Sequence, residues 1–431
     1  MNSRTTFLSP LFVLGLILAS TGAGLANADA ERQPAHLHIG VDEGDLRGND
    51  NRALQAAIDY VANLGGGTVE VGPGRYQMRN ALTLRDRVNL TGVPGKTVLV
   101  ACDGLERRLA ADGDCNERQI TLRDPAGFRV GDGVSIKDQR KDGFEVTTAT
   151  LTEQISPDTF RISAPLYLDY MVSDKASARL TFPVVGGWNV SNVTVSGLTI
   201  EGNRQHAQPL NGCRGGGIYL FECHDVVIRN CTVREYAGDG ISFQVSQHVT
   251  IEDCLSENNA GLGIHPGSGS QHPVVRNNRS IGNGGDGMYV CWRVKYGLFE
   301  GNELRGNQGV GVSIGHKDSD NVFRKNTIEN NAHAGVLFRE ESEAMGAHRN
   351  VFEENVVLDN GCTAEGKLVA APVVMRGVHK DVQFRNNTIG YTKPVGAKTP
   401  GVVAGEGVSG LRVEGNEFKN VAEPVSVAKE R

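Results

Sequence analysis

Six side chains that can move a proton or hold an anion lie between residues 265 and 339 of the chain. They are His265, Tyr289, Arg293, His316, Lys317 and Arg339. An imidazole or a phenol can remove a proton from carbon and assist a leaving oxygen, while a cation can neutralise a neighbouring carboxylate and so acidify that proton. The set therefore favours chemistry that begins with proton abstraction next to a carboxylate.

Four carboxylates within or directly after this stretch would serve a different chemistry. They are Asp286, Asp318, Glu340 and Glu341. Glycoside hydrolysis needs two carboxylates on either side of the bond, about 5 Å apart for retention and about 6.5–9.5 Å apart for inversion. Asp286 precedes a glycine in GGDGM, as Asp239 does in AGDGI, so we expect at least one of these two to form a turn.

Three further side chains are candidates for substrate binding, namely Tyr219, Gln244 and Trp292. Trp292 is one of only two tryptophans, and an exposed indole is a surface on which a sugar ring can stack. His265 lies in GIHPGSGSQ, where the small residues after it are expected to leave open space over the imidazole.

These candidates are placed by a repeat of glycine-led strands. Six glycines, each opening a short strand, are 23 or 24 residues apart: Gly217, Gly240, Gly263, Gly287, Gly311 and Gly335. A period in the low twenties with Asn and Gly at the bends is typical of a stacked solenoid. The sequence predicts an all-β fold, a right-handed parallel β-helix in which the six glycines form one column.

Alternation within the repeat predicts which side chains face the core. The first and third residues after each glycine are apolar or proline, and they are expected to point inward, while the second and fourth point outward. A second column is expected to form a buried amide ladder at a tight bend: Asn278, Asn302, Asn326, Asn355, Asn387 and Asn416.

The N-terminal part of the solenoid departs from the repeat. Asp50 can cap a helix over residues 51–63, with Leu54, Ile58 and Val61 on one side, and this helix would close the open end of the solenoid. Residues of about 101–182 contain alternating strands without the period and are expected to form a β-rich insertion. We therefore expect a single β-helix domain over residues 50–431.

Composition and the first residues bear on location. The net charge of −6 excludes a generally basic nucleic-acid binder. A basic start, an apolar run from Phe7 to Ala19 and the sequence Ala26-Asn27-Ala28 predict a signal peptide over residues 1–28, cut after Ala28, and a polar leader over residues 29–49. No later segment is apolar enough to span a bilayer. A monomer that is secreted or periplasmic is expected, with no membrane partner.

Export would allow the eight cysteines to be oxidised. They are Cys102, Cys115, Cys213, Cys223, Cys231, Cys254, Cys291 and Cys362. Cys102 and Cys115 flank a polar loop that a disulfide could close, whereas Cys231 and Cys254 share a column on successive coils and could be stacked thiols or a bridge. No spacing predicts a zinc site, and no aspartate cluster has calcium-ligand spacing, so Ca²⁺ is left only as a possible cofactor.

The segment NRALQAAIDYVANLGGGTVEVGPGRYQM (51–78) resembles the N-terminal segment of pectate lyase superfamily proteins of the rhamnogalacturonase-like and epimerase-like group. The later coils resemble the generic repeats of the same superfamily. The resemblance implies an enzyme that acts on a long polysaccharide laid along one sheet of the solenoid. Because lyases, hydrolases, epimerases and non-enzymatic adhesins share this fold, the reaction must be argued from the residues.

Three classes of function follow. The mixture of His, Tyr and cations favours a lyase that cleaves a uronate-containing polymer by β-elimination, and a uronate C5-epimerase would use the same residues and return the proton to the opposite face. A glycoside hydrolase would use two of the four carboxylates, although the paired-aspartate motif of polygalacturonases is absent. A polysaccharide-binding protein without chemistry would show more stacking aromatics, and aromatic residues are only 6% of this chain.

Overall fold

The computed structural model describes residues 34–362, 370–395 and 399–428 of the 431. The predicted signal peptide and the first residues of the polar leader lie outside these ranges. Among the described residues, no helix is long and apolar enough to cross a membrane.

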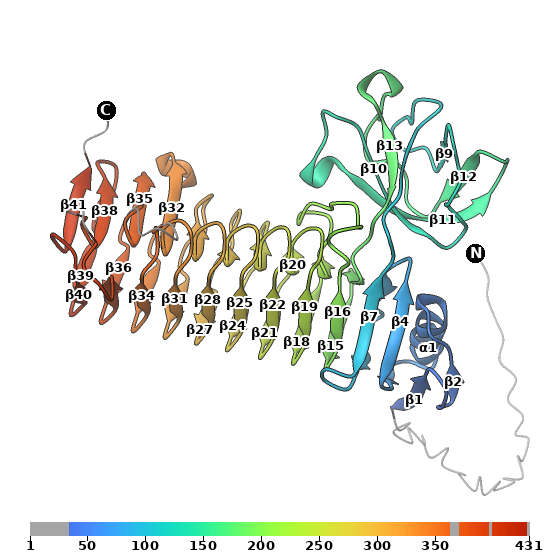
Figure 1. The fold of residues 1–431 in the computed structure, drawn as a ribbon, viewed down its shortest axis with the longest axis horizontal. Coiled ribbons are helices and arrows are strands. Elements are labelled where there is room, and N and C mark those ends of the chain that lie inside the picture. Colours follow the sequence, from blue (N-terminus) through green and yellow to red (C-terminus); the bar gives the residue numbers. More distant parts are fainter. Residues whose placement is uncertain (1–33, 363–369, 396–398, 429–431) are drawn as a thin grey trace, which may run out of the picture. The chain divides into compact units, whose positions relative to one another are not determined.

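Three parallel sheets run side by side along the described chain and form the predicted solenoid (Figure 1). The sheet that carries the glycine-led strands, called here the glycine-led sheet, has eleven strands. In spatial order they are β5 (Leu82–Thr83), β14 (Val185–Trp188), β17 (Ile218–Phe221), β20 (Ile241–Gln244), β23 (Ile264–Gly267), β26 (Met288–Tyr289), β29 (Val312–Ile314), β32 (Val336–Glu341), β35 (Val373–Gly377), β38 (Val402–Gly405) and β41 (Val425–Ala428).

The second sheet has thirteen strands, and the chain enters it after each glycine-led strand. They are β2 (Leu46–Arg47), β1 (Ala35–Gly40), β3 (Gly67–Val71), β6 (Val88–Thr91), β15 (Ser191–Ser196), β18 (His224–Arg229), β21 (Thr250–Glu252), β24 (Val274–Arg276), β27 (Leu298–Glu300), β30 (Val322–Arg324), β33 (Val351–Glu353), β36 (Gln383–Arg385) and β39 (Arg412–Glu414).

The third sheet completes each coil with a short strand and has eleven members. They are β4 (Gly74–Met78), β7 (Thr97–Ala101), β16 (Thr199–Glu201), β19 (Thr232–Arg234), β22 (Leu255–Glu257), β25 (Arg279–Ile281), β28 (Glu303–Arg305), β31 (Thr327–Glu329), β34 (Val356–Leu358), β37 (Thr388–Gly390) and β40 (Glu417–Lys419).

The predicted glycine column is confirmed, and the structure explains it. Gly240, Gly263 and Gly287 lie on successive coils, and each contacts the backbone carbonyl of the next glycine in the column. A Cβ on Gly263 would lie 1.8 Å from Ser280 Oγ and 2.7 Å from Asn283 Nδ2. Only glycine fits here, because the serine and asparagine of the following coil fill the space that a side chain would need.

The residues predicted to point inward form the core. The first and third residues of the glycine-led strands are buried, and they stack on their equivalents one coil away, as in the register Ile218 to Ile241 to Ile264. Further along, Phe299, Phe323 and Phe352 stack with ring centroids 4.5 Å apart. Each coil therefore buries its apolar face against its neighbours, as a solenoid requires.

The predicted helix is confirmed as α1 (Asn51–Asn63), which lies beside the first strands at the N-terminal end of the solenoid (Figure 1). The Asp50 carboxylate caps it by accepting hydrogen bonds from the Arg52 and Ala53 amides at 3.0 and 3.1 Å. Its buried face, which includes Leu54 and Ile58, joins the same hydrophobic core as the first coils.

An antiparallel sheet of six strands lies between β7 and β14 in the sequence and projects beside the first coils (Figure 1). Its strands are β8 (Glu106–Arg108), β9 (Gln119–Thr121), β10 (Gly133–Lys137), β11 (Thr147–Gln154), β12 (Thr159–Ile162) and β13 (Ser177–Leu180). Short 3₁₀ turns occur at Gly143–Glu145, Val172–Asp174 and Glu343–Met345. We call the six-stranded segment the insertion sheet.

The predicted Asn ladder is confirmed. Asn302 Oδ1 accepts from the backbone amide and side-chain amide of Asn278, both at 3.0 Å, and Asn302 Nδ2 donates to Val275 O and Asn326 Oδ1, both at 2.9 Å. The same pattern continues to Asn416, and a second ladder runs from Asn259 to Asn360. On the coils that the ladders span, these amides satisfy backbone groups at two bends that would otherwise be buried without partners.

Replacing Asn302 with leucine is expected to lower the free energy of unfolding by about 1–3 kcal/mol, because leucine leaves the buried Asn278 amide and Val275 carbonyl without partners. Urea unfolding would measure the loss. Gln308→Leu, on an exposed side chain of the same coil, is the matched control and should change stability little. An unchanged midpoint for Asn302→Leu would show that the ladder does not stabilise the fold.

The cysteine predictions are corrected in one respect. All eight cysteines lie within the described residues and are free thiols, so Cys102 and Cys115 do not form the disulfide that would close their loop. The Cys115 thiol lies 3.4 Å from the Tyr167 carbonyl of the insertion sheet instead. Cys231 and Cys254 are stacked thiols, each directed to a carbonyl of the preceding coil, at Val195 O and Ile228 O.

Candidate active site

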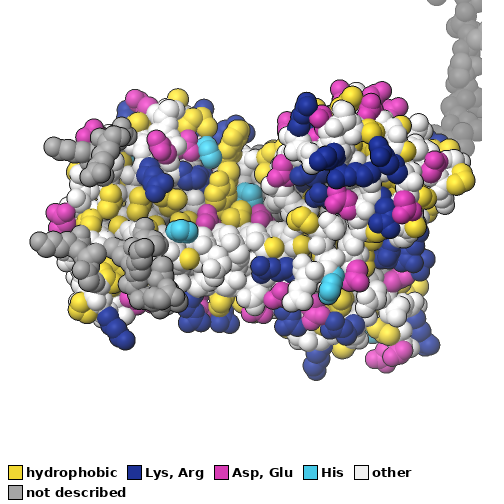
Figure 2. Space-filling model, turned by 45° about the horizontal axis from the view of Figure 1, so that its top comes forward, with side chains coloured by type: hydrophobic (Ala, Val, Ile, Leu, Met, Phe, Trp, Pro, Cys, Tyr) yellow, Lys and Arg dark blue, Asp and Glu magenta, His cyan; other side chains and the backbone are white. Residues whose placement is uncertain are grey.

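The outward side chains of the glycine-led sheet form one column along its middle strands. The register pairs Tyr219 with Ser242, Ser242 with His265, and Tyr289 with Ser313. Histidine and acidic side chains gather in the hollow between the insertion sheet and the coils on its C-terminal side (Figure 2). Whether each predicted site residue is accessible to a substrate therefore depends on what covers it.

Residues 203–216, called here the covering loop, close over the first part of this column. Tyr219 is 1% exposed and its hydroxyl donates to Cys213 O at 2.7 Å. Gln244 is 0% exposed and lies beside Gly212 O, which accepts a hydrogen bond from Ser242 at 2.7 Å. The covering loop therefore buries Tyr219 and Gln244, the two residues of this column that the sequence predicted to bind substrate.

The covering loop also closes over the Nδ1 side of His265, so the open space predicted there is absent. His265 is 5% exposed, and a Cβ on Gly212 of the covering loop would lie 2.7 Å from its Nδ1. The imidazole is instead held by a residue whose role the sequence did not define. Asp239 Oδ2 lies 2.8 Å from His265 Nδ1, and Asp239 Oδ1 accepts from the Leu262 amide at 2.9 Å.

This carboxylate fixes the imidazole in one tautomer. With Nδ1–H directed to Asp239, the other nitrogen, Nε2, carries the lone pair that can accept a proton. Asp239 is itself anchored to the backbone of the next coil, so the pair is preorganised before substrate arrives. A buried, carboxylate-oriented histidine with this geometry is suited to act as a general base.

Tyr289 lies next to His265 on the following coil. The two rings are nearly perpendicular, at 82°, with centroids 5.4 Å apart. On the other side of the phenol, the Arg339 guanidinium lies 4.4 Å from the ring centroid. Burial raises the pKa of the Tyr289 phenol above its ordinary value of 10, and Arg339 opposes this rise. At neutral pH the phenol is therefore protonated and can donate a proton.

Arg339 is held by several partners at once. It donates to Ser313 Oγ and Val290 O, both at 2.8 Å, and its Nη2 lies 3.3 Å from Asp318 Oδ2. Asp318 is 0% exposed and also accepts from the Val294 amide at 2.8 Å. Burial raises the pKa of Asp318 to about 7, against the effect of Arg339.

His316 extends the cluster toward the end of the strands. Its Nε2 lies 3.1 Å from Glu341 Oε1, and its Nδ1 lies 3.3 Å from Arg339 Nη2. Burial and the Arg339 charge lower the pKa of His316, while Glu341 opposes them. A neutral imidazole fits both contacts, since Nε2–H donates to Glu341 and Nδ1 accepts from Arg339.

The four carboxylates proposed for hydrolysis occupy different environments. Asp318 is buried and bonded to backbone amides, so it cannot reach a glycosidic bond, and Glu341 is engaged by His316. Asp286 forms the turn that the sequence suggested, since its Oδ1 accepts from the Val310 amide at 2.9 Å. Burial raises the pKa of Asp286. Glu340 is exposed.

Arg293, Lys317 and Trp292 lie at the bends that follow the glycine-led strands and are exposed. Trp292 is 44% exposed, its ring lies 5.5 Å from that of His316, and Arg293 lies over it at 5.8 Å. The structure thus brings His265, Tyr289, His316 and Arg339 together, with Trp292 beside His316. It leaves Arg293 and Lys317 at the rim.

Two partners in the cluster were not selected from the sequence as site residues. Asp239 was visible only as an aspartate before a strand glycine, a position that it shares with Asp286. Ser313, which accepts from Arg339, is an ordinary outward serine in the repeat. The signal in the sequence was the register of the repeat. It places Asp239 at the bend just before β20, and β20 pairs with β23, the strand that carries His265.

Comparisons with known proteins agree with this architecture. Residues 183–362 match the family model described as "Periplasmic copper-binding protein (NosD)". A mannuronan C5-epimerase of Azotobacter vinelandii, AlgE6, is 42% identical over 74 residues, which is 15% of this chain and 8% of that protein. The matched segment is thus a small part of the relative's length.

Two solved structures show the fold over most of the chain. The A-module of the A. vinelandii mannuronan C5-epimerase AlgE4 superposes with a TM-score of 0.60 at 18% identity, over 91% of this chain and 100% of that one. The Streptococcus pneumoniae surface adhesin PfbA gives 0.53 at 13% identity, over 88% and 96%. These likenesses show the fold: the chain is a right-handed parallel β-helix.

The family description names copper, which the described residues of this chain do not fit. Among the described residues, no three His, Cys, Asp or Glu side chains are grouped so that they could hold a metal ion. The nearest arrangement is Cys291 Sγ at 3.9 Å from His316 Nδ1, but the Arg339 guanidinium lies against the same nitrogen and burial raises the pKa of the Cys291 thiol to about 11. This donor set does not fit copper, and no group of three such side chains in the described residues offers a site for calcium.

Proposed function

We propose that this protein modifies a uronate-containing polysaccharide by removing the C5 proton of a uronate residue and returning a proton to the opposite face, the reaction of a uronate C5-epimerase. The observation that carries the proposal is the continuous contact from Asp239 to His265 to Tyr289 to Arg339 on the outward face of the glycine-led sheet. The names of the similar proteins, mannuronan C5-epimerases, support the same substrate class.

In this proposal His265 is the base. Its Nε2 takes the C5 proton, the C5–H bond breaks, and the electron pair spreads onto the uronate carboxylate. The Asp239 carboxylate stabilises the imidazolium that forms, because it already accepts the Nδ1 proton at 2.8 Å. Such a base contributes about 10²–10⁴-fold to a rate.

Tyr289 is the acid that completes the exchange. Its phenol gives a proton to C5 from the other side, and the Arg339 cation at 4.4 Å from the ring stabilises the phenolate left behind. The rings of His265 and Tyr289 are in near-perpendicular edge contact, so a sugar laid across the pair meets both side chains. Proton transfer from the imidazolium to the phenolate through solvent restores the starting state.

A lyase is the second candidate, since β-elimination begins with the same abstraction by the same His, Tyr and Arg groups. Hydrolysis receives less support, because Asp318 is buried and Glu341 is engaged by His316. The signal peptide predicted for residues 1–28 and the word periplasmic in the family description support a location outside the cytoplasm.

Incubation with mannuronate, guluronate and galacturonate polymers in D₂O is the test. An epimerase is expected to incorporate deuterium at C5, read by NMR, without new reducing ends or absorbance from an unsaturated product. Absorbance together with reducing ends would identify a lyase and replace the epimerase. Reducing ends without absorbance would promote the hydrolase, and no change in any polymer would contradict proton abstraction from these uronates. The His265→Gln variant is the control for contaminating activity.

A further inference from the structure

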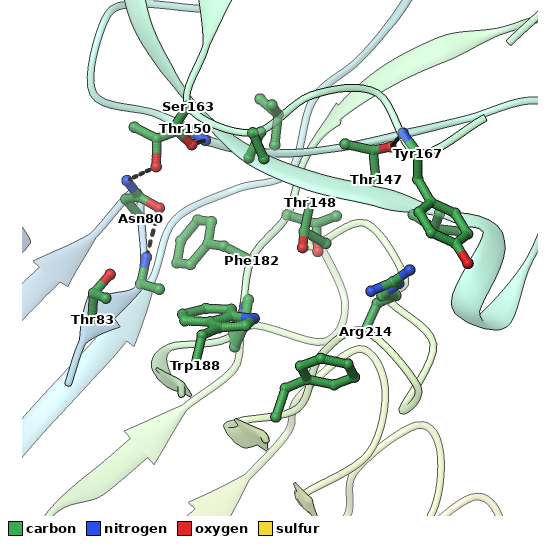
Figure 3. A pocket seen from close by; sticks show the side chains of 18 of the residues that line it. Asn80, Thr83, Thr147, Thr148, Thr150, Ser163, Tyr167, Phe182, Trp188 and Arg214 are labelled. Carbon is green, nitrogen blue, oxygen red and sulfur yellow. Dashed lines mark hydrogen bonds between the residues drawn. The ribbon is translucent and has the colours of Figure 1, made fainter. Parts of the chain in front are cut away.

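A cavity of about 440 Å³ lies between the insertion sheet and the first strands of the glycine-led sheet (Figure 3). It is lined from β10 and β11 on one side and from β14 and β17 on the other. None of the residues discussed as base, acid or charge-stabilising group lines it. The covering loop, through Arg214, contributes to its wall, and the loop's remainder separates it from His265.

The floor of this cavity is aromatic. The edge of the Trp188 indole lies over Gly186, where a Cβ would be 2.3 Å from a ring carbon, so only glycine leaves room for the ring. Phe182 and Phe221 lie beside it, and Thr148 and Ser163 add hydroxyl groups to the wall. A flat ring surrounded by hydroxyls is suited to stack on a sugar and to bond its hydroxyl groups.

The cavity also holds a cation without a counter-charge. Arg214 donates through Nε to Phe144 O at 3.0 Å, and its guanidinium lies 5.0 Å from the Tyr167 ring and 5.6 Å from the Phe144 ring. Within the part of the chain that the structure describes, Arg214 makes no ion pair with a carboxylate, unlike most arginines of the insertion sheet. A stacked, half-buried guanidinium aimed into a cavity is an anion site.

We propose that this cavity is a subsite for an acidic sugar residue of the polymer, with the ring stacked on Trp188 and its carboxylate paired with Arg214. The proposal rests on the proposed function for its substrate class. The strands β14 and β23 are three coils apart, which is about 14 Å at ~4.8 Å per coil. The sugar bound here is therefore not the reacting one, and a chain that occupies both positions crosses the outer surface of the covering loop.

The first test is binding without turnover. In the His265→Gln background, calorimetry would measure the affinity for uronate oligosaccharides and for their carboxyl-reduced counterparts. We expect Arg214→Gln, which keeps a donor for Phe144 O, to weaken uronate binding at least tenfold and to remove the preference for the charged sugar. Trp188→Ala should weaken both ligands. Arg229→Gln removes an exposed cation of the second sheet and should bind as the parent does.

The second test uses the two tryptophans of the chain. In a Trp292→Phe variant, Trp188 is the sole tryptophan, and its emission, excited at a wavelength that tyrosine does not absorb, should shift when the uronate oligosaccharide is titrated. Equal affinities in the parent, Arg214→Gln and Trp188→Ala proteins, with melting curves showing each is folded, would overturn the subsite and leave the proposed reaction untouched. If binding depends on Arg214 but no deuterium enters C5 in D₂O, the proposed reaction is contradicted and the subsite is supported. No binding of any uronate oligosaccharide would overturn the subsite.

Discussion

Replacing His265 with glutamine is expected to lower turnover of a uronate polymer at least about 100-fold with the fold intact, because glutamine can bond Asp239 but cannot take a proton from carbon. Asp239→Asn should cause a loss of similar size. The asparagine carbonyl can still accept from the Leu262 amide, but its NH₂ group would face His265 Nδ1 and force the proton onto Nε2, where the base is needed. Deuterium exchange at C5 would measure both effects.

Asp286→Asn is the matched control for Asp239→Asn. Asp286 occupies the same position before a strand glycine and makes the same bond to the next coil, from Val310 N, but no histidine contacts its second oxygen. Its substitution should lower activity much less. The opposite ranking, with Asp286→Asn or Glu340→Gln inactive and His265→Gln active, would contradict proton abstraction by His265 and promote the hydrolase.

The structure separates Lys317 from Arg339, although the sequence made them equal candidates for the same role. Its type and spacing favour it as the group that neutralises the substrate carboxylate, equal to Arg293 and Arg339. The structure places it on an exposed bend after the strand, whereas Arg339 is fixed beneath Tyr289. In the proposed reaction Arg339 therefore supplies the positive charge beside Tyr289. Lys317 and Arg293 attract the polymer from the rim of the site.

The repeat made much of the fold and part of the site predictable. A constant period fixes which residues stack, so the glycine column, the Asn ladder and the placement of His265 and Tyr289 on adjacent coils follow from counting. Arg339 joins them because an arginine is long enough to cross from its own coil to Tyr289, two coils back.

What the repeat could not predict lies in segments that depart from it. The covering loop has no periodic partner, so its position over Tyr219 and Gln244 depends on contacts such as that of Arg214 with Phe144, a residue of the insertion sheet's 3₁₀ turn. The cavity beneath the insertion sheet is formed in the same way, by residues distant in sequence. The contact of Asp239 with His265 depends on a side-chain rotamer, which spacing does not determine.

Arg339→Met is expected to give the largest loss of stability, about 3–5 kcal/mol, because it leaves the fully buried Asp318 carboxylate without its cation. It also leaves Ser313 Oγ and Val290 O without their donor. Arg339→Lys keeps the charge but cannot reproduce the fork of contacts, so its loss should be intermediate. Urea unfolding followed by circular dichroism would measure each variant.

The pH dependence tests whether Asp318 is the cause. In the folded protein burial raises the pKa of Asp318 to about 7 from an ordinary value of 3.8, so its contribution to stability is present at low pH and is lost as the pH rises toward 7. Without Arg339 the Asp318 carboxyl stays protonated over a wider pH range, and its ionisation at high pH destabilises the fold more. The destabilisation by Arg339→Met should therefore be larger at pH 8 than at pH 5.

A double variant separates the buried charge from the lost hydrogen bonds. Arg339→Met combined with Asp318→Asn should recover part of the stability at pH 8, because no unpaired carboxylate remains, while the bonds to Ser313 and Val290 stay broken. The recovery should shrink at pH 5, where Asp318 is already neutral. Equal destabilisation at both pH values, with no recovery in the double variant, would show that packing around Arg339, rather than its charge, holds this part of the site together.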